Sequence, residues 1–452
     1  MTSTSPFPAD CLPHQPVILQ NIRILDPVNY DDTVGAILLI DGEAYVLAQE
    51  QLGETMDLSA LSLPTAVADR VQLDDLQTMD ADDWVFGPGL VDLYSHSGEP
   101  GFETRETVAT LATSAIAGGF TRLALLPDTN PALDTPGAIA HLHQAFQALT
   151  HAPSIYFWGA LTQGAAGKQM TELGELVQSE ETSNVVGLAD HHAIQDLTLV
   201  QRILEYGNTL NAPIALFPQN HALANSGVAR EGTVATQLGL PTQDANAETT
   251  ALSAIIECVE STGTPVHIMR VSTARSVDLI YKAKEKELPI TASTTWMHVL
   301  LNSYALGQYD PNLRIEPPLG NAEDQTALIL GLKTGVLDAI AIDHTPHTYE
   351  EKTVPFALAP PGVIGLQCAL PLLWQGLVEA GHFSPLDLWR TLSMNPSLCL
   401  GQTPPTIDSE WVLFNTQQEW TMSIESLCSL ATNVPWINQN IQGQVVGNSC
   451  QA

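Results

Sequence analysis

Apolar residues alternate between short runs and longer segments with helical spacing through most of the chain. The runs FGPGLVDLYS (86–95) and TRLALLP (121–127) have the character of buried strands, and the helix-like segment ETVATLATSAIAGGF (106–120) lies between them. About eight such strand and helix alternations follow one another between residues 85 and 400. This α/β order is typical of a (β/α)8 barrel or a doubly wound parallel sheet, and the length of the region favours the barrel.

The two ends of the chain carry short strand-like runs without helical segments between them. PVILQNIRILD (16–26) and AILLIDGEAYVLA (36–48) lie near the N-terminus, and EWVLFNTQQEWTMS (410–423) and IQGQVVGN (441–448) lie near the C-terminus. We expect residues 1–84 and 405–452 to form one small β-sandwich domain, with the barrel at 85–404. A loop-rich interval is predicted from about Glu50 to Asp83.

The chain is strongly acidic. Its 50 Asp and Glu residues against 16 Lys and Arg give a formal net charge of -34 at pH 7. Because this charge repels phosphate backbones and anionic membranes, we predict that the protein binds neither nucleic acid nor membrane. The six cysteines are scattered singly, and no stretch approaches the roughly 20 apolar residues of a membrane span. These features predict a soluble cytoplasmic protein whose acidity serves solubility in a salty cell or attracts a basic protein partner.

Titratable residues stand where four of the predicted barrel strands end. They are His96 after GLVDLYS, Asp190 after VVGLA, Arg270 after PVHIM and Asp343 after AIAI. Reactive side chains of a (β/α)8 barrel come from such strand ends, and imidazole and carboxylate groups are suitable zinc ligands. Together with His344 and His347 of DHTPH they could form a metal site, or they could be hydrogen-bonded loop residues.

The order of short motifs gives the chain a resemblance to a known family. The motifs are GPGLVDL, EPGFETRETVAT, AGGFT, PDTNP, LGLP, VSTA, EPPLG, EDQTALILGLKTGVLDAIAIDHTPH and PGVIGL. In this order, over nearly the whole chain, they closely resemble the dihydroorotase family of the amidohydrolase superfamily, in the form in which an aspartate bridges two zinc ions. The resemblance implies an amidohydrolase-type barrel, and the EPGFE loop favours a dihydroorotase over hydantoinase and allantoinase relatives.

The family holds its two zinc ions with four histidines and two aspartates. The corresponding positions of this chain are Tyr94, His96, Asp190, Phe217, Arg270 and Asp343, so three of the six are not the family's histidine. Phe217 has no lone pair, Tyr94 is a phenol with an ordinary pKa near 10, and Arg270 carries a fixed positive charge. We expect Arg270 to bind Asp190 or Asp343 instead and to replace the charge of the metal.

The family's substrate-binding positions are altered as well. The arginine that binds the substrate carboxylate corresponds to Gly98, and the Asn and Arg that flank the PPL motif correspond to Glu316 and Gly320. Loss of the arginine and gain of Glu316 are expected to repel an anion such as dihydroorotate. Asn130 and His347 match the family's substrate-binding residues, and they could equally serve only to structure their loops.

Other histidines could rebuild a metal site with His96. His191 and His192 lie just beyond the strand VVGLA, and His267 and His298 lie near other strand ends, as His344 does. Adjacent residues of a strand point to opposite faces, so at most one of His191 and His192 is expected to face the pocket. We expect outer or surface positions for most of these side chains.

The matching scaffold and the altered site together favour a noncatalytic protein. Family members that lack metal ligands assemble with aspartate transcarbamoylase, so the resemblance implies this partner, an oligomeric assembly and no bound cofactor at the remnant positions His96, Asp190 and Asp343. The alternative is an active zinc-dependent dihydroorotase or related cyclic amidohydrolase, in which Asp343 is the catalytic base. A small-molecule sensor that uses the vacated pocket is a third possibility.

Overall fold

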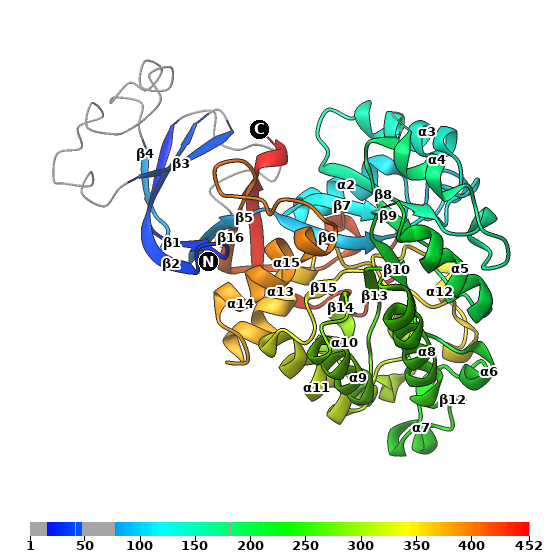
Figure 1. Ribbon diagram of the computed structural model, residues 1–452. Helices are drawn as coiled ribbons and strands as arrows, with labels where there is room; N and C mark the ends of the chain where they lie inside the picture. Colours follow the sequence, from blue (N-terminus) through cyan, green and yellow to red (C-terminus); the bar gives the residue numbers. More distant parts are fainter. Residues whose placement is uncertain (1–15, 41, 48–76, 180–181, 211, 452) are drawn as a thin grey trace.

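The computed structural model describes residues 16–40, 42–47, 77–179, 182–210 and 212–451. Figure 1 shows a large body of alternating strands and helices, with a smaller sheet at its side to which both ends of the chain contribute. Most of the predicted loop-rich interval from Glu50 to Asp83 lies outside the described residues. Its described end contains the short strand β4 (Gln77–Asp80).

Eight parallel strands form the predicted barrel, in the order β6, β7, β8, β9, β10, β13, β14 and β15. Their bounds are β6 (Leu90–Ser95), β7 (Phe120–Leu125), β8 (Ser154–Ala160), β9 (Val185–Ala189), β10 (Ile214–Leu216), β13 (Val266–Ile268), β14 (Ile290–Thr295) and β15 (Ala339–Ala341). The ends of β15 and β6 meet where the Asp343 amide donates to the Tyr94 carbonyl at 3.1 Å and the His96 amide donates to the His344 carbonyl at 2.9 Å. The (β/α)8 fold class is therefore confirmed.

Helices cover the outside of the barrel strands. The longer ones are α2 (Val108–Ala117), α3 (Pro136–Gln147), α5 (Leu197–Gly207), α8 (Asn246–Thr262), α9 (Ala274–Glu285) and α11 (Ala322–Thr334). The shorter ones are α4 (Leu173–Gln178), α6 (His221–Ala224), α7 (Thr233–Leu238), α10 (Trp296–Leu300), α12 (Tyr349–Lys352), α13 (Ala369–Leu373), α14 (Pro385–Trp389) and α15 (Asn395–Cys399). In α5 the buried residues Val200, Ile203 and Leu204 recur at helical spacing, and the Asp196 side chain caps the first turn.

The barrel strands bury both of their faces. In β7, Leu123 and Leu125 pack outward against the helices, whereas Ala124 lies in the cluster that fills the barrel interior. Alanines from several strands give this interior room for the Trp158 side chain, which is fully buried and donates from Nε1 to the Leu93 carbonyl at 2.8 Å. The interior of the barrel is thus a packed core.

The small sheet joins strands from both ends of the chain. Its order is β17 (Asn440–Asn448), β16 (Trp411–Thr421), β5 (Trp84–Pro88), β1 (Val17–Asp26), β2 (Asp31–Ile40) and β3 (Glu43–Leu47), and β4 pairs with β1. The chain passes from β5 into β6 of the barrel at Gly89, so the small sheet and the barrel are joined there without a linker. A side chain at Gly87 would come within 2.3 Å of the Trp389 indole, which requires glycine at this junction.

Two predictions from composition concern membrane spans and cysteines. Within the described part of the chain, no helix combines the length and apolarity needed to cross a membrane. Among the described cysteines, Cys258, Cys368, Cys399 and Cys450 are free thiols, and Cys11 lies outside the described residues.

Candidate functional site

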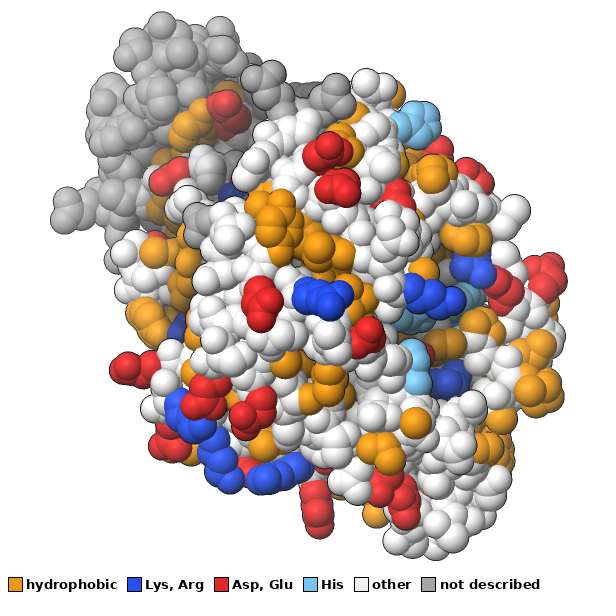
Figure 2. Space-filling model, turned by 45° about the vertical axis from the view of Figure 1, so that its right-hand side comes forward, with side chains coloured by type: hydrophobic (Ala, Val, Ile, Leu, Met, Phe, Trp, Pro, Cys, Tyr) orange, Lys and Arg blue, Asp and Glu red, His pale blue; other side chains and the backbone are white. Residues whose placement is uncertain are grey.

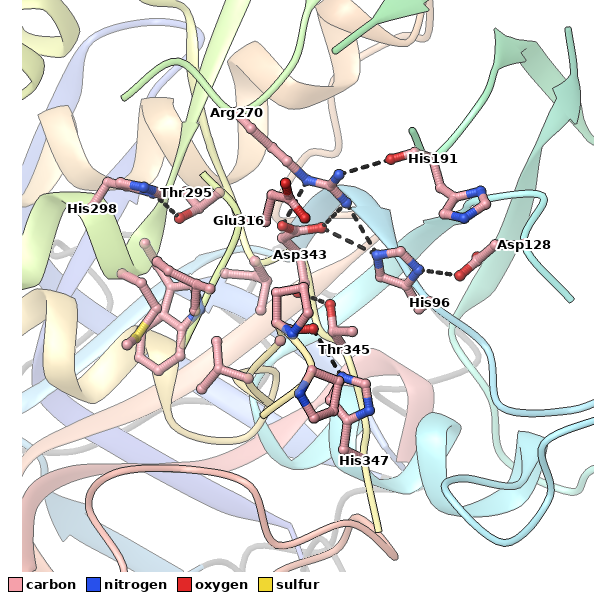
Figure 3. Close-up of a pocket in the computed structure, with 18 of the residues that line it drawn as sticks. His96, Asp128, His191, Arg270, Thr295, His298, Glu316, Asp343, Thr345 and His347 are labelled. Carbon is pink, nitrogen blue, oxygen red and sulfur yellow. Dashed lines mark hydrogen bonds and ion pairs between the residues drawn. The ribbon is translucent and has the colours of Figure 1, made fainter. Parts of the chain in front are cut away.

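A pocket of about 240 Å³ opens at the carboxyl ends of the barrel strands. Figure 2 shows the barrel hollowed on one face, where histidine and basic side chains gather. Of the predicted site residues, His96, Arg270, Asp343 and His347 line the pocket (Figure 3). Asn130 and Asp190 are not among its lining residues. The pocket lies where barrels of this fold carry their sites, because loops from every strand converge there.

Arg270 lies in the pocket, and each of its three guanidinium nitrogens forms a hydrogen bond. Nε and Nη2 donate to the two carboxylate oxygens of Asp343 at 2.8 and 2.6 Å, and Nη1 donates to the His191 carbonyl at 2.9 Å. Arg270 is only 5% exposed, so this bidentate pair is withdrawn from water. The sequence left Asp190 and Asp343 open as partners of Arg270, and the structure pairs it with Asp343.

Tyr94 and Phe217 flank the guanidinium as aromatic walls. Their ring centroids lie 5.7 and 5.3 Å from the Arg270 guanidinium carbon, within the range of cation–π contacts. The Tyr94 hydroxyl accepts from the Arg270 amide at 3.0 Å and lies 3.0 Å from Ser293 Oγ. Burial raises the pKa of Tyr94 further above its ordinary value, so a metal-binding phenolate is unfavourable. Both residues therefore support Arg270.

His96 joins Arg270 and Asp343 to a second carboxylate, Asp128. His96 Nδ1 lies 2.6 Å from Asp128 Oδ2, and Nε2 lies 3.4 Å from Asp343 Oδ1. Burial alone would lower the pKa of His96, but the two carboxylates outweigh it and raise the pKa to about 9. His96 Nε2 also lies 3.1 Å from Arg270 Nη2, so Arg270, His96 and the two carboxylates form one connected group. Sequence reasoning missed Asp128, although its place directly after β7 in PDTNP was a usable signal.

Arg270 and Asp343 share an uncommon backbone conformation. Their φ angles are +54° and +52°, in the left-handed region that residues other than glycine seldom adopt. Such a conformation costs roughly 1–2 kcal/mol per residue and persists only where the surrounding structure fixes it. The ion pair between the two side chains, together with the amide bonds of both residues to Tyr94, supplies that constraint.

Asp190 turns away from the pocket cations. Its carboxylate accepts from the Thr162 amide at 3.1 Å and from the Thr162 hydroxyl, which orders the loop after β8. Burial raises the pKa of Asp190 to about 6, against the lowering effect of these hydrogen bonds. In this position Asp190 organises a loop and does not bridge toward Asp343.

His191 and His192 both line the pocket, which corrects the expectation that at most one would face it. The strand β9 ends at Ala189, and the two histidines lie in the bend that follows, so strand alternation does not apply to them. Their ring centroids lie 3.7 Å apart, and the ring planes are tilted by 45° to each other. Burial lowers the pKa of His191 to about 3, so its imidazole is neutral at physiological pH.

His298 lies on the other side of the pocket from His191 (Figure 3). Its Nε2 bonds to the Pro317 carbonyl at 3.1 Å, and its Nδ1 bonds to Thr295 Oγ1 at 2.7 Å. Burial, with the positive charge of Arg230 nearby, lowers the pKa of His298 from 6.5 to about 4. The hydrogen bonds and the lowered pKa both describe a neutral imidazole that helps to fix the wall.

The lowered pKa of His298 predicts a dependence of stability on pH. Between pH 6.5 and 4 the unfolded chain takes up a proton at this residue and the folded chain does not, so acid removes stability. When the pH is lowered from 7 to 5, the free energy of unfolding should decrease for both proteins. We expect the decrease to be about 2 kcal/mol smaller for His298→Gln than for the wild type. Urea unfolding at a series of pH values measures this, and parallel curves for the two proteins would contradict it.

Two of the positions that correspond to the family's substrate contacts leave no room for a side chain that could bind an anion. A side chain at Gly98 would come within 2.3 Å of the Glu106 carbonyl oxygen, and one at Gly320 within 2.7 Å of Asp324 Cβ. Glu316 lines the pocket and accepts from Gln219 Nε2 at 2.8 Å. Asn130 is exposed, and its backbone amide donates to the Pro100 carbonyl. His347 alone of the two matching residues reaches the pocket, where its Nε2 bonds to the Pro361 carbonyl.

The residues at the pocket do not suit the two zinc ions that the family resemblance implies. The guanidinium of Arg270 lies between His96 and Asp343, where it would repel a divalent cation, and Asp190 faces another loop. Among the described residues no three His, Cys, Asp or Glu side chains are grouped as metal ligands require. We therefore derive no catalytic step through zinc from this arrangement.

Comparisons with known proteins agree with the motif pattern. Residues 84–276 match the family model described as Dihydro-orotase-like. A Synechocystis protein named "Probable dihydroorotase-like protein" is 42% identical, covering 94% of this chain and 97% of that protein. A dihydroorotase of Caldanaerobacter subterraneus is 35% identical, covering 83% and 87%. The L-hydantoinase (dihydropyrimidinase) of Arthrobacter aurescens has a TM-score of 0.76 at 19% identity, covering 95% and 93%, which shows the shared fold alone. The chain belongs to the dihydroorotase-like family.

Proposed function

We propose that this protein is a noncatalytic member of the dihydroorotase-like family that serves pyrimidine biosynthesis as a structural partner. One observation carries the proposal. The Arg270 guanidinium forms a bidentate pair with Asp343, the residue that the family resemblance makes the catalytic base. An arginine stays protonated in proteins and accepts no bond, so it cannot serve as a ligand in place of histidine.

The electrostatics of Asp343 also oppose hydrolysis. Burial alone would raise the pKa of this carboxyl, but Arg270 and His96 hold it well below its usual range. A general base works best when its pKa lies near the operating pH, and Asp343 is far from this. Both carboxylate oxygens are already engaged by Arg270, so a water molecule would have to displace that arginine.

Aspartate transcarbamoylase is the partner that we propose, on the strength of the family resemblance. The fold supports a structural role, because the barrel and the small sheet are complete while the substrate contacts at Gly98 and Gly320 are closed. The surface charge supports a partner with a basic docking surface, because the chain carries a formal net charge of -34.

The first experiment measures metal content and activity together. The protein is purified without chelator, incubated with zinc, desalted and examined by elemental analysis, and dihydroorotate hydrolysis is assayed in parallel. We expect no retained zinc and no turnover above the background. Retention of about one or two zinc ions per chain, with turnover, would establish the competing function. That function is an active zinc-dependent dihydroorotase or related cyclic amidohydrolase, which the 35% identity to a dihydroorotase favours.

The second experiment tests the partner. The protein and the aspartate transcarbamoylase of the same organism are mixed at micromolar concentration and examined by sedimentation velocity. We expect a complex that sediments faster than either protein and that weakens as salt is raised, because an acidic surface is involved. Separate sedimentation of the two proteins at low salt would remove the proposed partner, while leaving the absence of catalysis to the first experiment.

A further inference from the structure

The cationic groups of the pocket are already paired, although the pocket is lined by several of them. Arg270 is bound by Asp343, and His96 is bound by Asp128. Arg105, at the pocket entrance, donates from Nε to Glu351 at 3.1 Å. An incoming carboxylate or phosphate would have to displace one of these partners, so the pocket offers an anion no free positive charge.

Acceptor groups of the pocket, in contrast, remain available. Within the described residues no Lys, Arg or His forms an ion pair with Glu316, whose single hydrogen bond comes from the neutral amide of Gln219. Asp128 Oδ1 has no hydrogen-bond partner. His347 donates from Nε2 to the Pro361 carbonyl, and its Nδ1 lies 3.6 Å from Glu351 Oε2, so this residue is already engaged. Glu316 and Asp128 both line the pocket.

Aromatic rings line part of the pocket. The rings of His191 and His192, which are tilted by 45° to each other, form part of its wall, and Trp296 forms another part. Its volume of about 240 Å³ leaves room for a small organic molecule. Aromatic faces attract cations as well as stacked rings, so the walls and the acceptors favour the same class of ligand.

We propose that this pocket binds a small planar organic cation that carries several N–H donors, such as an amidinium or guanidinium compound. Glu316 supplies the charge that selects the cation, and the neighbouring acceptors receive its N–H groups. The ligand class is opposite in charge to dihydroorotate. The inference rests on the proposed function in one respect, that the pocket holds no zinc.

Three probes of nearly the same shape test this proposal, namely benzamidinium, benzamide and benzoate. Each is titrated by calorimetry into the full-length protein after chelator treatment and dialysis, so that the result does not depend on whether zinc can bind. We expect saturable binding of benzamidinium, at least roughly tenfold weaker binding of benzamide, and no binding of benzoate. Binding of benzoate as tight as that of benzamidinium, or no saturable benzamidinium binding at millimolar concentration, overturns the proposal.

A matched pair of variants locates the binding. Glu316→Gln keeps the shape of the side chain and an acceptor for Gln219, and we expect it to weaken benzamidinium at least roughly tenfold while benzamide changes little. Glu419→Gln removes the same charge from the exposed face of the small sheet and should leave both titrations unchanged. Equal weakening by the two variants would show attraction to the general negative charge of the chain and would overturn the assignment to this pocket. Zinc retained in the metal experiment would contradict the proposed function, whereas the titrations of the zinc-free protein test the ligand of the pocket separately.

Discussion

Replacing Arg270 by methionine is expected to lower the free energy of unfolding by about 3–5 kcal/mol, the usual cost of removing one member of a buried ion pair. Methionine keeps much of the volume of arginine, so the loss comes from the charge. Asp343 would remain buried without its bidentate partner, and the His191 carbonyl would lose a donor. Urea unfolding followed by circular dichroism at neutral pH measures the change.

Two matched variants separate this effect from the general loss of an arginine. Arg105→Met breaks the pair with Glu351, in which both side chains are about one-third exposed (30% and 31%), and it should cost less than about 1 kcal/mol. The double variant Arg270→Met with Asp343→Leu removes both buried charges and should recover a large part of the lost stability. A cost of less than about 1 kcal/mol for Arg270→Met would contradict the central role given to this pair.

Rebuilding the histidines is expected to restore zinc binding only when all three substitutions are made. The triple variant Tyr94→His, Phe217→His and Arg270→His returns the nitrogen ligands at the strand ends beside His96 and Asp343, and it removes the guanidinium charge. We expect it to retain about one or two zinc ions per chain after desalting. Arg270→His alone should retain none, because Tyr94 and Phe217 still stand at two ligand positions.

The control for this series is the double variant Tyr94→His with Phe217→His, which keeps Arg270. It carries two new imidazoles, one fewer than the triple variant, but the Arg270 guanidinium is still bound to Asp343. Elemental analysis of the three variants in parallel should find zinc in the triple variant only. Zinc in the double variant would show that Arg270 can move aside, and the loss of zinc binding could then no longer be assigned to it.

The fold was open to prediction because its signals are local. Each strand of the barrel is a short apolar run and each helix carries its own apolar face, as Val200, Ile203 and Leu204 do in α5. The repeated alternation then favours one architecture. The bend after β9 escaped prediction because strand alternation was extended past Ala189, where the strand had already ended, and both His191 and His192 therefore face the pocket.

The sequence predicted which residues stand at the replaced ligand positions of the candidate site, but not which partners the site residues bind. That Tyr94, Phe217 and Arg270 stand at histidine positions is a property of the sequence and of its resemblance to the family. The sequence could not show which carboxylate binds Arg270. Asp343 lies 73 residues away along the chain, and both Asp343 and Asp190 follow other strands than the one before Arg270. Asp128, which follows β7, binds His96 from a neighbouring strand end and was not singled out.

Residue type and order were enough to predict the family, the barrel and the chemical nature of the replaced ligands. The folded chain was needed to show that Arg270 pairs with Asp343, that Asp190 turns to Thr162 and that Gly98 has no space for a side chain. These contacts depend on strand ends that are distant in sequence and converge at one rim of the barrel. There, the geometry of the closed sheet selects which charges come within bonding distance.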